Sequence, residues 1–276
     1  MAKKLIFIGL INQDIDRTPT KETTAPGGAV YFAALAAARN GLNENVEMVG
    51  RVGTDFDLMQ IRKKIGESGI IVDAEMPSTK SIQIYHSDTD LTDRDIEFEP
   101  GASLQLTPND IPKHWLTSEN FFHIATMPPA MQGMFVDFFN NHPEKLSFSI
   151  DTDLTFLSDE ENLKQVKHNF AEADLVFVNR REAEALGDVL PKLKQVILKL
   201  DKDGAQFWQA GQKLFDVSCP KVEVVNATGA GDILAGTYLS NKELKEMSEE
   251  EALTDAIAQA SLATTYEHKE DFLFEL

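Results

Sequence analysis

Cysteine is almost absent from this sequence, since Cys219 is the only one among 276 residues. A single cysteine excludes an internal disulfide, which indicates a reducing compartment, and we expect a cytoplasmic protein. Uninterrupted apolar runs of about 18 residues are also lacking, so no membrane-spanning helix is expected. The apolar start, Leu5–Ile11, continues into Asn12-Gln13-Asp14 without a small-residue cleavage site. It is therefore predicted to be a buried first strand and not a signal peptide.

Positive charge is scarce as well. Lys and Arg number 26 against 45 Asp and Glu, which gives a formal net charge of −19 at pH 7. Nucleic acids and anionic membrane surfaces are bound through basic patches, so neither partner is expected. The same charge repels nucleotides at long range, and a nucleotide site must therefore supply local hydrogen-bond donors and a cation. The 42% of hydrophobic and 26% of charged residues are typical of a folded globular protein.

Short apolar runs alternate with longer amphipathic stretches along most of the chain. Strands are predicted at 5–11, 46–49, 121–125, 146–150, 175–178 and 196–200, and helices at 29–39, 55–65, 129–141, 159–169 and 181–187. This rhythm predicts an α/β fold with a mostly parallel central sheet and helices on both faces.

Two segments break this rhythm. Residues 12–26 are polar, and residues 71–100 alternate apolar and polar side chains, as antiparallel strands with one solvated face do. We expect both to form a small β-lid inserted into a single domain of residues 1–276. Ordinary surface hairpins are the alternative reading of the same pattern.

The segment from Val224 to Asp232 carries the clearest chemical pattern. Residues 222–225 are apolar and predicted to form a strand, Gly229-Ala230-Gly231 follows, and residues 233–239 are predicted to be helical. Small residues where a strand meets a helix allow close backbone approach, and the unpaired N–H groups of the helix start face a bound anion. The segment therefore predicts an anion hole.

Asp232 lies in the first turn of that predicted helix. In a structural role its carboxylate would merely favour the helix start. In a catalytic role it would accept the proton of an attacking hydroxyl while the amides hold the transferred phosphoryl group. The segment is not a Walker loop, because no Gly-Lys-Ser/Thr follows, and Leu234 stands where a dinucleotide fingerprint would have its third glycine.

The same string resembles the C-terminal signature Asp-Thr-x-Gly-Ala-Gly-Asp of the ribokinase-like (PfkB) carbohydrate kinase family. Other segments resemble motifs of this family and follow in the family's order: residues 9–14, Gly27-Gly28-Ala29, residues 49–55, Asn179–Glu182 and Gly204-Ala205. The resemblance covers nearly the whole chain. It implies a three-layer αβα sandwich and an ATP-dependent kinase that transfers the γ-phosphoryl group to a hydroxyl of a small molecule, first of all a sugar. A nucleoside or cyclitol kinase and a catalytically silent ligand-binding relative are the alternatives.

The resemblance also implies roles on the ATP side of the site. Asp232 would be the general base, and the anion hole would consist of the amides of Gly229, Ala230 and Gly231. Glu182 would act on Mg²⁺ through water, and Asn179 would reach phosphate or the water shell of the metal. The nucleotide would further meet Lys199, Gly204 and Thr228. ATP and Mg²⁺ are therefore the expected cofactors. The structural alternatives are a solvated helix start for Asn179 and Glu182, and a strand cap for Lys199.

On the acceptor side, the resemblance implies that Asn12 and Asp14 bind hydroxyl groups and that Gly27 and Gly28 bring backbone close to the acceptor. Arg94, the only arginine between residues 71 and 100, would touch the acceptor. A turn residue is the structural alternative for Asp14, and a solvated side chain is the alternative for Arg94.

The chain departs from the family pattern at four places, one of which is the absence, around His268-Lys269, of the C-terminal Gly-Ala turn usual in the ribokinases. Phe32 stands where many sugar kinases have an asparagine, so Tyr31-Phe32 would stack on a nucleobase or pack on the sheet. Asn226-Ala227 replaces Asp-Thr, and the missing carboxylate argues against a potassium site of the family's kind. Asp201 replaces a glycine in the turn before Gly204. Both a monomer and a homodimer agree with the sequence.

Overall fold

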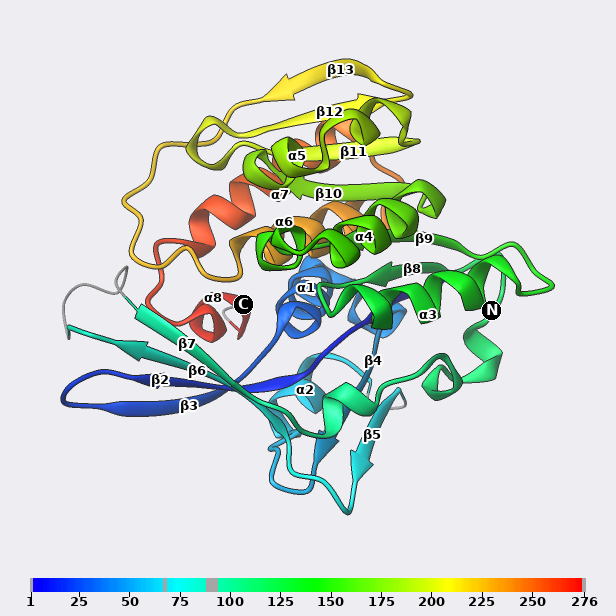
Figure 1. Cartoon of the computed structure of the whole chain (residues 1–276). Coiled ribbons are helices and arrows are strands. Elements are labelled where there is room, and N and C mark those ends of the chain that lie inside the picture. The colour runs from blue at the N-terminus through cyan, green and yellow to red at the C-terminus, as the bar shows by residue number, and fades with distance from the viewer. Residues whose placement is uncertain (1, 67–68, 88–93, 275–276) are drawn as a thin grey trace.

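Short apolar segments such as Leu5–Ile8 and Phe121–Ile124 form the middle of a nine-stranded sheet, in the order β13-β12-β11-β10-β9-β8-β1-β4-β5 (Figure 1). The computed structural model describes residues 2–66, 69–87 and 94–274. The strands are β1 (Leu5–Ile8), β4 (Val46–Gly53), β5 (Ile70–Asp73), β8 (Phe121–Ile124), β9 (Ser147–Asp151), β10 (Leu175–Asn179), β11 (Gln195–Lys199), β12 (Ala205–Gln209) and β13 (Gln212–Val217). Neighbours from β5 to β11 pair in parallel, and β12 and β13 continue the sheet in antiparallel.

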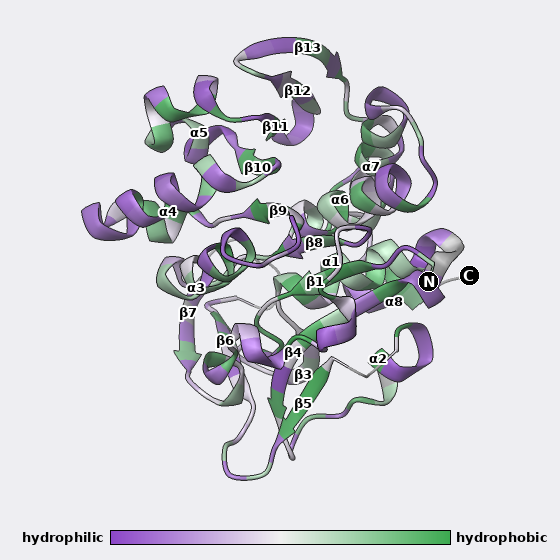
Figure 2. Ribbon diagram, turned by 90° about the vertical axis from the view of Figure 1, so that its right-hand side faces the viewer, coloured by the Kyte–Doolittle hydropathy of each residue, from purple (hydrophilic) through white to green (hydrophobic). Residues whose placement is uncertain are grey.

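Helices cover both faces of this sheet, which explains why its central strands are apolar on both sides (Figure 2). One face carries α1 (Ala29–Ala37), α6 (Ala230–Leu239) and α7 (Glu249–Ala263), and the other carries α3 (Pro129–Asn140), α4 (Glu160–Glu172) and α5 (Arg180–Leu186). Two short helices, α2 (Met59–Lys64) and α8 (Lys269–Phe274), complete the set used below. The predicted three-layer α/β architecture is thereby confirmed.

A second sheet of four strands lies apart from the first (Figure 1). Its order is β3-β2-β6-β7, with the bounds β2 (Asn12–Arg17), β3 (Glu22–Gly27), β6 (Thr79–Tyr85) and β7 (Arg94–Glu99). The two segments that break the αβ rhythm thus supply its strands. The segment from residue 71 nevertheless divides between the sheets, because Ile70–Asp73 pairs in parallel with β4 of the large sheet.

Other local expectations were wrong. Residues 222–225 form no strand, because the large sheet already ends at β13, and the side chains of Val224 and Val225 are 59% and 51% exposed. The helix predicted at 55–65 begins only at Met59, because the carboxylate of Asp55 accepts hydrogen bonds from Ser78 and holds its own residue in a turn.

Across the part of the chain that the structure describes, no helix has both the length and the apolar character that crossing a bilayer requires.

Candidate active site

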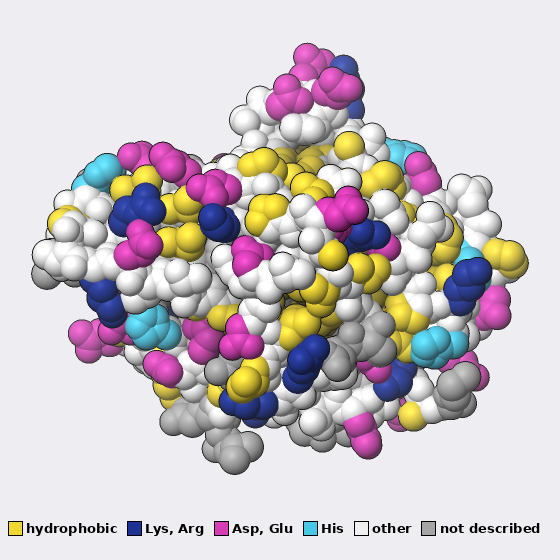
Figure 3. All heavy atoms as spheres, turned by 90° about the horizontal axis from the view of Figure 1, so that it is seen from below, with side chains coloured by type: hydrophobic (Ala, Val, Ile, Leu, Met, Phe, Trp, Pro, Cys, Tyr) yellow, Lys and Arg dark blue, Asp and Glu magenta, His cyan; other side chains and the backbone are white. Residues whose placement is uncertain are grey.

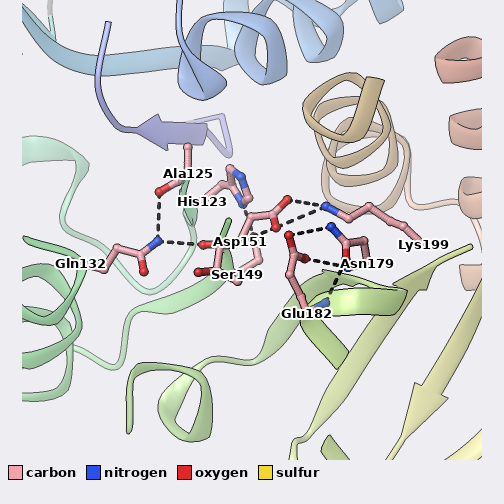
Figure 4. A network of polar contacts seen from close by, with 9 residues as sticks. His123, Ala125, Gln132, Ser149, Asp151, Asn179, Glu182 and Lys199 are labelled. Atoms are coloured by element: carbon pink, nitrogen blue, oxygen red, sulfur yellow. Dashed lines mark hydrogen bonds and ion pairs between the residues drawn. The ribbon is translucent and has the colours of Figure 1, made fainter. Parts of the chain in front are cut away.

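Three polar side chains stand at the carboxyl ends of adjacent parallel strands. Asp151 ends β9, Asn179 ends β10 and Lys199 ends β11, so the parallel register brings them side by side (Figure 4). Gln132 of α3 fixes this edge, since its Nε2 donates to the carbonyls of Ala125 at 3.1 Å and Asp151 at 2.7 Å. The edge of an open α/β sheet where strands end is a usual place for ligands.

Lys199 forms an ion pair with Asp151. Its Nζ lies 2.9 Å and 3.2 Å from the two carboxylate oxygens, and both side chains are largely buried. Burial works against the charged amine, but the carboxylates of Asp151 and Glu182 raise the pKa of Lys199 above its ordinary value. The ammonium is therefore retained at neutral pH.

Asn179 and Glu182 bind each other at the start of α5. The backbone N–H and the Nδ2 of Asn179 each donate to one carboxylate oxygen of Glu182 at 2.7 Å, and the N–H of Glu182 donates to Asn179 Oδ1 at 2.9 Å. This is a capping box that satisfies the orphan amides of a helix start. Glu182 is buried, so the alternative of a solvated helix start is wrong. Burial raises the pKa of Glu182 to about 7, and Asp151 adds to that effect.

The N-terminus of α6 offers unpaired amides. Gly229 is its N-cap with a φ of +75°, a left-handed conformation that favours glycine, and the ring of Phe32 packs against it. Ala230 N–H donates to the carbonyl of Ala227 at 3.2 Å, so this amide is engaged within the loop. Within the described residues, the N–H groups of Gly229, Gly231 and Asp232 have no protein acceptor. Three amides and the helix dipole thus remain for an anion.

Asp232 lies beside these amides and beside Lys199. Burial, together with the negative charges of Asp151 and Asp153, raises the pKa of Asp232 to about 7, and Lys199 opposes this shift. A Cβ placed on Gly231 would lie 3.3 Å from the Nζ of Lys199, so the ammonium sits directly under the helix start. A carboxyl group with a pKa near 7 in such a place suits a general base.

Asp14 of β2 faces the same site from the small sheet. Burial raises the pKa of Asp14 to about 8, with contributions from the charges of Asp16, Glu270 and Asp232. The negative charge of Asp232 contributes to this shift, so the start of α6 lies within electrostatic range of the small sheet. The backbone N–H of Gly28 donates to the Asp14 carboxylate, so Asp14 is more than a turn residue.

Glycine is required at the last residue of β3 and at the residue that follows it. A Cβ on Gly27 would overlap the Asp14 carboxylate, and Gly28 has a φ of +102° with its hydrogen atoms against the carbonyl of Leu10. The chain therefore passes Asp14 as closely as backbone can. Nearby, the Oδ1 of Asn12 is buried without a hydrogen-bond partner among the described residues. Such an atom costs free energy unless a ligand satisfies it.

Apart from Arg94, the other residues predicted to contact the acceptor or the nucleotide lie in the core or in turns around the site. Tyr31 and Phe32 are buried in the core, so they pack on the sheet and present no ring for stacking. Gly204 forms the turn between β11 and β12 with a φ of +102° and has the carbonyl of Val217 against it. Thr228 donates its N–H to Asn226 Oδ1 at 2.9 Å in the turn before α6. The side chain of Arg94 is outside the described residues.

Sequence reasoning missed Asp151 and Glu270. An acidic residue directly after the apolar strand 146–150 was an available signal for Asp151, because parallel strands present their carboxyl ends at one edge. No local pattern points to Glu270, which reaches Asp14 only through the folding of α8 against α1.

The charges of the site fit a complex of a divalent cation with an anion. Asp151, Glu182 and Asp232 are electrostatically coupled, and Lys199 is the cation among them. No group of three or more His, Cys, Asp and Glu side chains in the described part of the chain forms a metal cage. Mg²⁺ commonly binds through one or two carboxylates, water and substrate phosphates, so these residues fit it as partners of a magnesium–phosphate complex.

Comparison with known proteins agrees with this geometry. The family model described as pfkB family carbohydrate kinase matches residues 2–271. A cytidine kinase of Thermococcus kodakarensis is 27% identical over 254 residues, covering 86% of this chain and 87% of its own. A ribokinase of Lactococcus lactis is 26% identical over 294 aligned positions, covering 95% and 89%. An E. coli protein assigned as ribokinase II, solved with ATP and Mg²⁺, superposes with a TM-score of 0.80 at 20% identity, covering 98% and 96%.

Proposed function

This chain belongs to the pfkB family of carbohydrate kinases, phosphotransferases with hydroxyl acceptors, and we propose that it transfers the γ-phosphoryl group of ATP to a hydroxyl of a sugar. The observation that carries the proposal is the position of Asp232. Its carboxylate lies beside unpaired amides at the start of α6 and is electrostatically coupled to Asp14 on the small sheet. A base, an anion hole and an acceptor-side carboxylate therefore share one site.

In this proposal the acceptor lies between the small sheet and α6. Asp14 and the unpartnered Oδ1 of Asn12 accept hydrogen bonds from its hydroxyl groups, which fixes one hydroxyl toward Asp232. Asp232 takes the proton of that hydroxyl as it attacks the γ-phosphorus. The amides of Gly229 and Gly231 hold the equatorial oxygens of the transferred group. Because the transition state is loose, positioning contributes more than base strength.

Lys199 and the surrounding carboxylates serve the nucleotide. The ammonium under Gly231 stabilises charge on the phosphates, and Asp151 keeps it in place. Glu182 acts on Mg²⁺ through bound water, because both of its oxygens already accept hydrogen bonds from Asn179. When bound, the Mg²⁺ neutralises phosphate charge that the acidic site would otherwise repel.

A nucleoside is the second candidate acceptor. The match to a cytidine kinase favours it, since a nucleoside carries the ribose hydroxyls that Asp14 and Asn12 would bind. The buried rings of Tyr31 and Phe32 offer no support for it, because neither is free to stack on a base. A sugar therefore remains the first candidate.

The small sheet would act as a lid over the acceptor. It presents Asp14 to the site, and its closure on a bound acceptor would exclude water and limit hydrolysis of ATP. This function requires the four strands to be ordered around the acceptor, with Asn12 and Asp14 of β2 facing it.

The test is a panel of sugars, cyclitols and nucleosides incubated with Mg²⁺-ATP, with phosphorylated products identified by mass spectrometry. We expect a product with at least one polyol and none with Asp232→Asn. A matched control, Asp137→Asn on the exposed face of α3, should retain activity. Binding of ATP without product over the whole panel would contradict the proposal and favour a ligand-binding relative.

A further inference from the structure

Lys269, the first residue of α8, is only 3% exposed and carries an unusual set of partners. Its Nζ donates to the backbone carbonyls of Asn226 at 2.6 Å, Ala263 at 2.9 Å and Tyr266 at 3.4 Å. No carboxylate in the described part of the chain lies within ion-pair distance of this ammonium. The positive charge is therefore solvated by carbonyl oxygens alone.

These carbonyls connect the anion-hole loop to the turn after α7. We define the anion-hole loop as residues 226–231. Its first residue, Asn226, donates its N–H to the carbonyl of Thr264 at 3.0 Å and its Nδ2 to the carbonyl of Glu267 at 2.9 Å. The Oδ1 of the same side chain accepts from Thr228. The position of the loop thus depends on the turn 263–269, and the ammonium of Lys269 links the two through its hydrogen bonds.

The chemistry of this junction is that of a monovalent cation site. Three carbonyl dipoles point at one position, and without a positive charge there their oxygens would repel one another. A hydrophobic side chain would fill the space but leave the carbonyl of Asn226 without its hydrogen bond. A buried ammonium without a carboxylate is itself costly, and burial accordingly lowers the pKa of Lys269 to about 8. Burying this ammonium therefore contributes little net free energy to folding. Its clearer effect is on the position of the loop 226–231, whose first carbonyl it binds.

The residue at position 226 is neutral in this chain. The signature that the loop resembles has an aspartate there, and a carboxylate would neutralise a cation at this junction. Asn226 adds no negative charge next to Lys269, and the carboxylate of Glu270 offsets the ammonium only in part, so the field of Lys269 adds to that of the α6 N-terminus.

We propose that the ammonium of Lys269 is a built-in monovalent cation that positions the anion-hole loop, so that the enzyme needs no potassium or ammonium ion for phosphoryl transfer. The positioning of the loop follows from the contacts of Lys269. The consequence for catalysis rests on the proposed kinase function. Lys269 touches neither acceptor nor phosphate in this proposal and acts through Asn226.

The first experiment measures folding without any substrate. Lys269→Ala removes the ammonium and leaves room for a free cation, and Lys192→Ala, at a 71% exposed lysine, is the matched control. Thermal unfolding is followed in tetramethylammonium chloride and in ammonium or potassium chloride at constant ionic strength. We expect Lys269→Ala to melt roughly 5 °C below wild type and to recover saturably with ammonium or potassium. Wild type and Lys192→Ala should respond equally to all three salts.

The second experiment measures phosphoryl transfer in the same salts. Wild type should keep its rate within about twofold in tetramethylammonium chloride, and Lys269→Ala should lose roughly 10- to 100-fold and regain activity with ammonium. A wild-type rate that depends tenfold or more on potassium would overturn the proposal, even if Lys269→Ala fails to fold. So would a folded Lys269→Ala that neither responds to ammonium in melting nor loses activity. The melting result stands without ATP or acceptor, so it separates a failure of this inference from a failure of the kinase assignment.

Discussion

At the scale of single residues, the site is an excess of carboxyl groups that the fold holds out of water. Burial raises the pKa of Asp14 to about 8 and the pKa values of Glu182 and Asp232 to about 7. Each of these acids binds its proton more tightly in the folded than in the unfolded protein. Such perturbed groups in one place are typical of functional sites and cost stability when they ionise.

This predicts a dependence of stability on pH with a definite sign. An acid whose pKa is raised on folding stabilises the fold fully below its unfolded pKa, and that contribution is lost as the pH rises through the folded pKa. The free energy of unfolding of the nucleotide-free protein should therefore fall between about pH 4 and pH 8. Asp14→Asn should be more stable than wild type at pH 8 and close to it at pH 5. Urea denaturation at both pH values measures this.

The control for that prediction is Asp137→Asn, whose carboxylate is exposed. It should follow the wild-type profile at both pH values. An Asp14→Asn variant that is less stable than wild type at pH 8 would show that the ionised carboxylate is well compensated, against the present account.

The ion pair of Lys199 with Asp151 makes a second prediction. Lys199→Met leaves the Asp151 carboxylate buried and unpaired, which should lower the free energy of unfolding by about 3–5 kcal/mol in urea denaturation. The double variant Lys199→Met/Asp151→Asn should recover most of that loss, since the carboxylate in direct contact with the ammonium is removed together with it. A loss below about 1 kcal/mol in the single variant would mean that the pair behaves like a solvated surface pair.

The sequence indicates some of these residues and not others. Asp232, Asp14 and Glu182 stand in motifs with fixed spacing, so their candidacy was visible, although their roles remain proposals. Lys269 was not visible, because its partners are backbone carbonyls at residues 226, 263 and 266. Only the folded backbone directs several carbonyl oxygens at one point, so no pattern of side chains in the sequence reveals such a site.

At the scale of elements, the close contact of α1 with α6 fixes the position of the unpaired amides at the start of α6. A Cβ on Gly236 of α6 would overlap the carbonyl of Ala33 in α1, so the two helices touch through their backbones. The ring of Phe32 in α1 supports Gly229 at the start of α6. The glycine and alanine content of both helices therefore sets the depth at which the amides of α6 reach the site.

Gly236→Ala should test this contact. The added methyl group must push α6 away from α1, which we expect to lower the free energy of unfolding by about 1–3 kcal/mol. Gly133→Ala in α3 is the matched control, because its Cβ would meet side-chain atoms of Gln165 at 2.7 Å and Asn169 at 3.4 Å and no backbone of another helix. There the better helix propensity of alanine should leave stability unchanged or raise it by up to about 1 kcal/mol. Equal effects of both substitutions would contradict the close helix contact.

The prediction of elements from sequence succeeded where burial on two faces makes the strand continuously apolar, as at Leu5–Ile8 and Val196–Leu198. It failed at residues 222–225, where three valines alternate along an exposed segment without a partner strand. It also gave no indication of the β12–β13 hairpin at the sheet edge, because polar residues such as Gln212 and Lys213 dilute the pattern.

At the scale of the whole molecule, the protein is strongly acidic, and the hydrogen-bond donors and ammonium groups available to an anion are gathered at the start of α6. On the face shown in Figure 3, basic side chains are scattered singly among acidic ones. The net charge of −19 acts at long range, while the amides of α6 and the ammonium groups of Lys199 and Lys269 act locally. Affinity for a phosphate-bearing ligand must therefore come from the site and from the metal that accompanies it.

The order of motifs along the chain predicted this assembly well, because the parallel topology brings strand ends from distant segments to one edge. The division of residues 71–100 between two sheets was not predictable. It depends on a register between Ile70–Asp73 and β4 that alternation alone does not reveal.

The most direct test of the account is the rate of phosphoryl transfer in Asp232→Asn. Single-turnover transfer from γ-labelled Mg²⁺-ATP to an acceptor found in the panel is compared with wild type, and the Kd of Mg²⁺-ATP is measured in parallel. We predict a rate at least about 10²-fold lower with a Kd changed by less than about threefold. Equal transfer rates in the two proteins would contradict the role of Asp232 and with it the proposed mechanism.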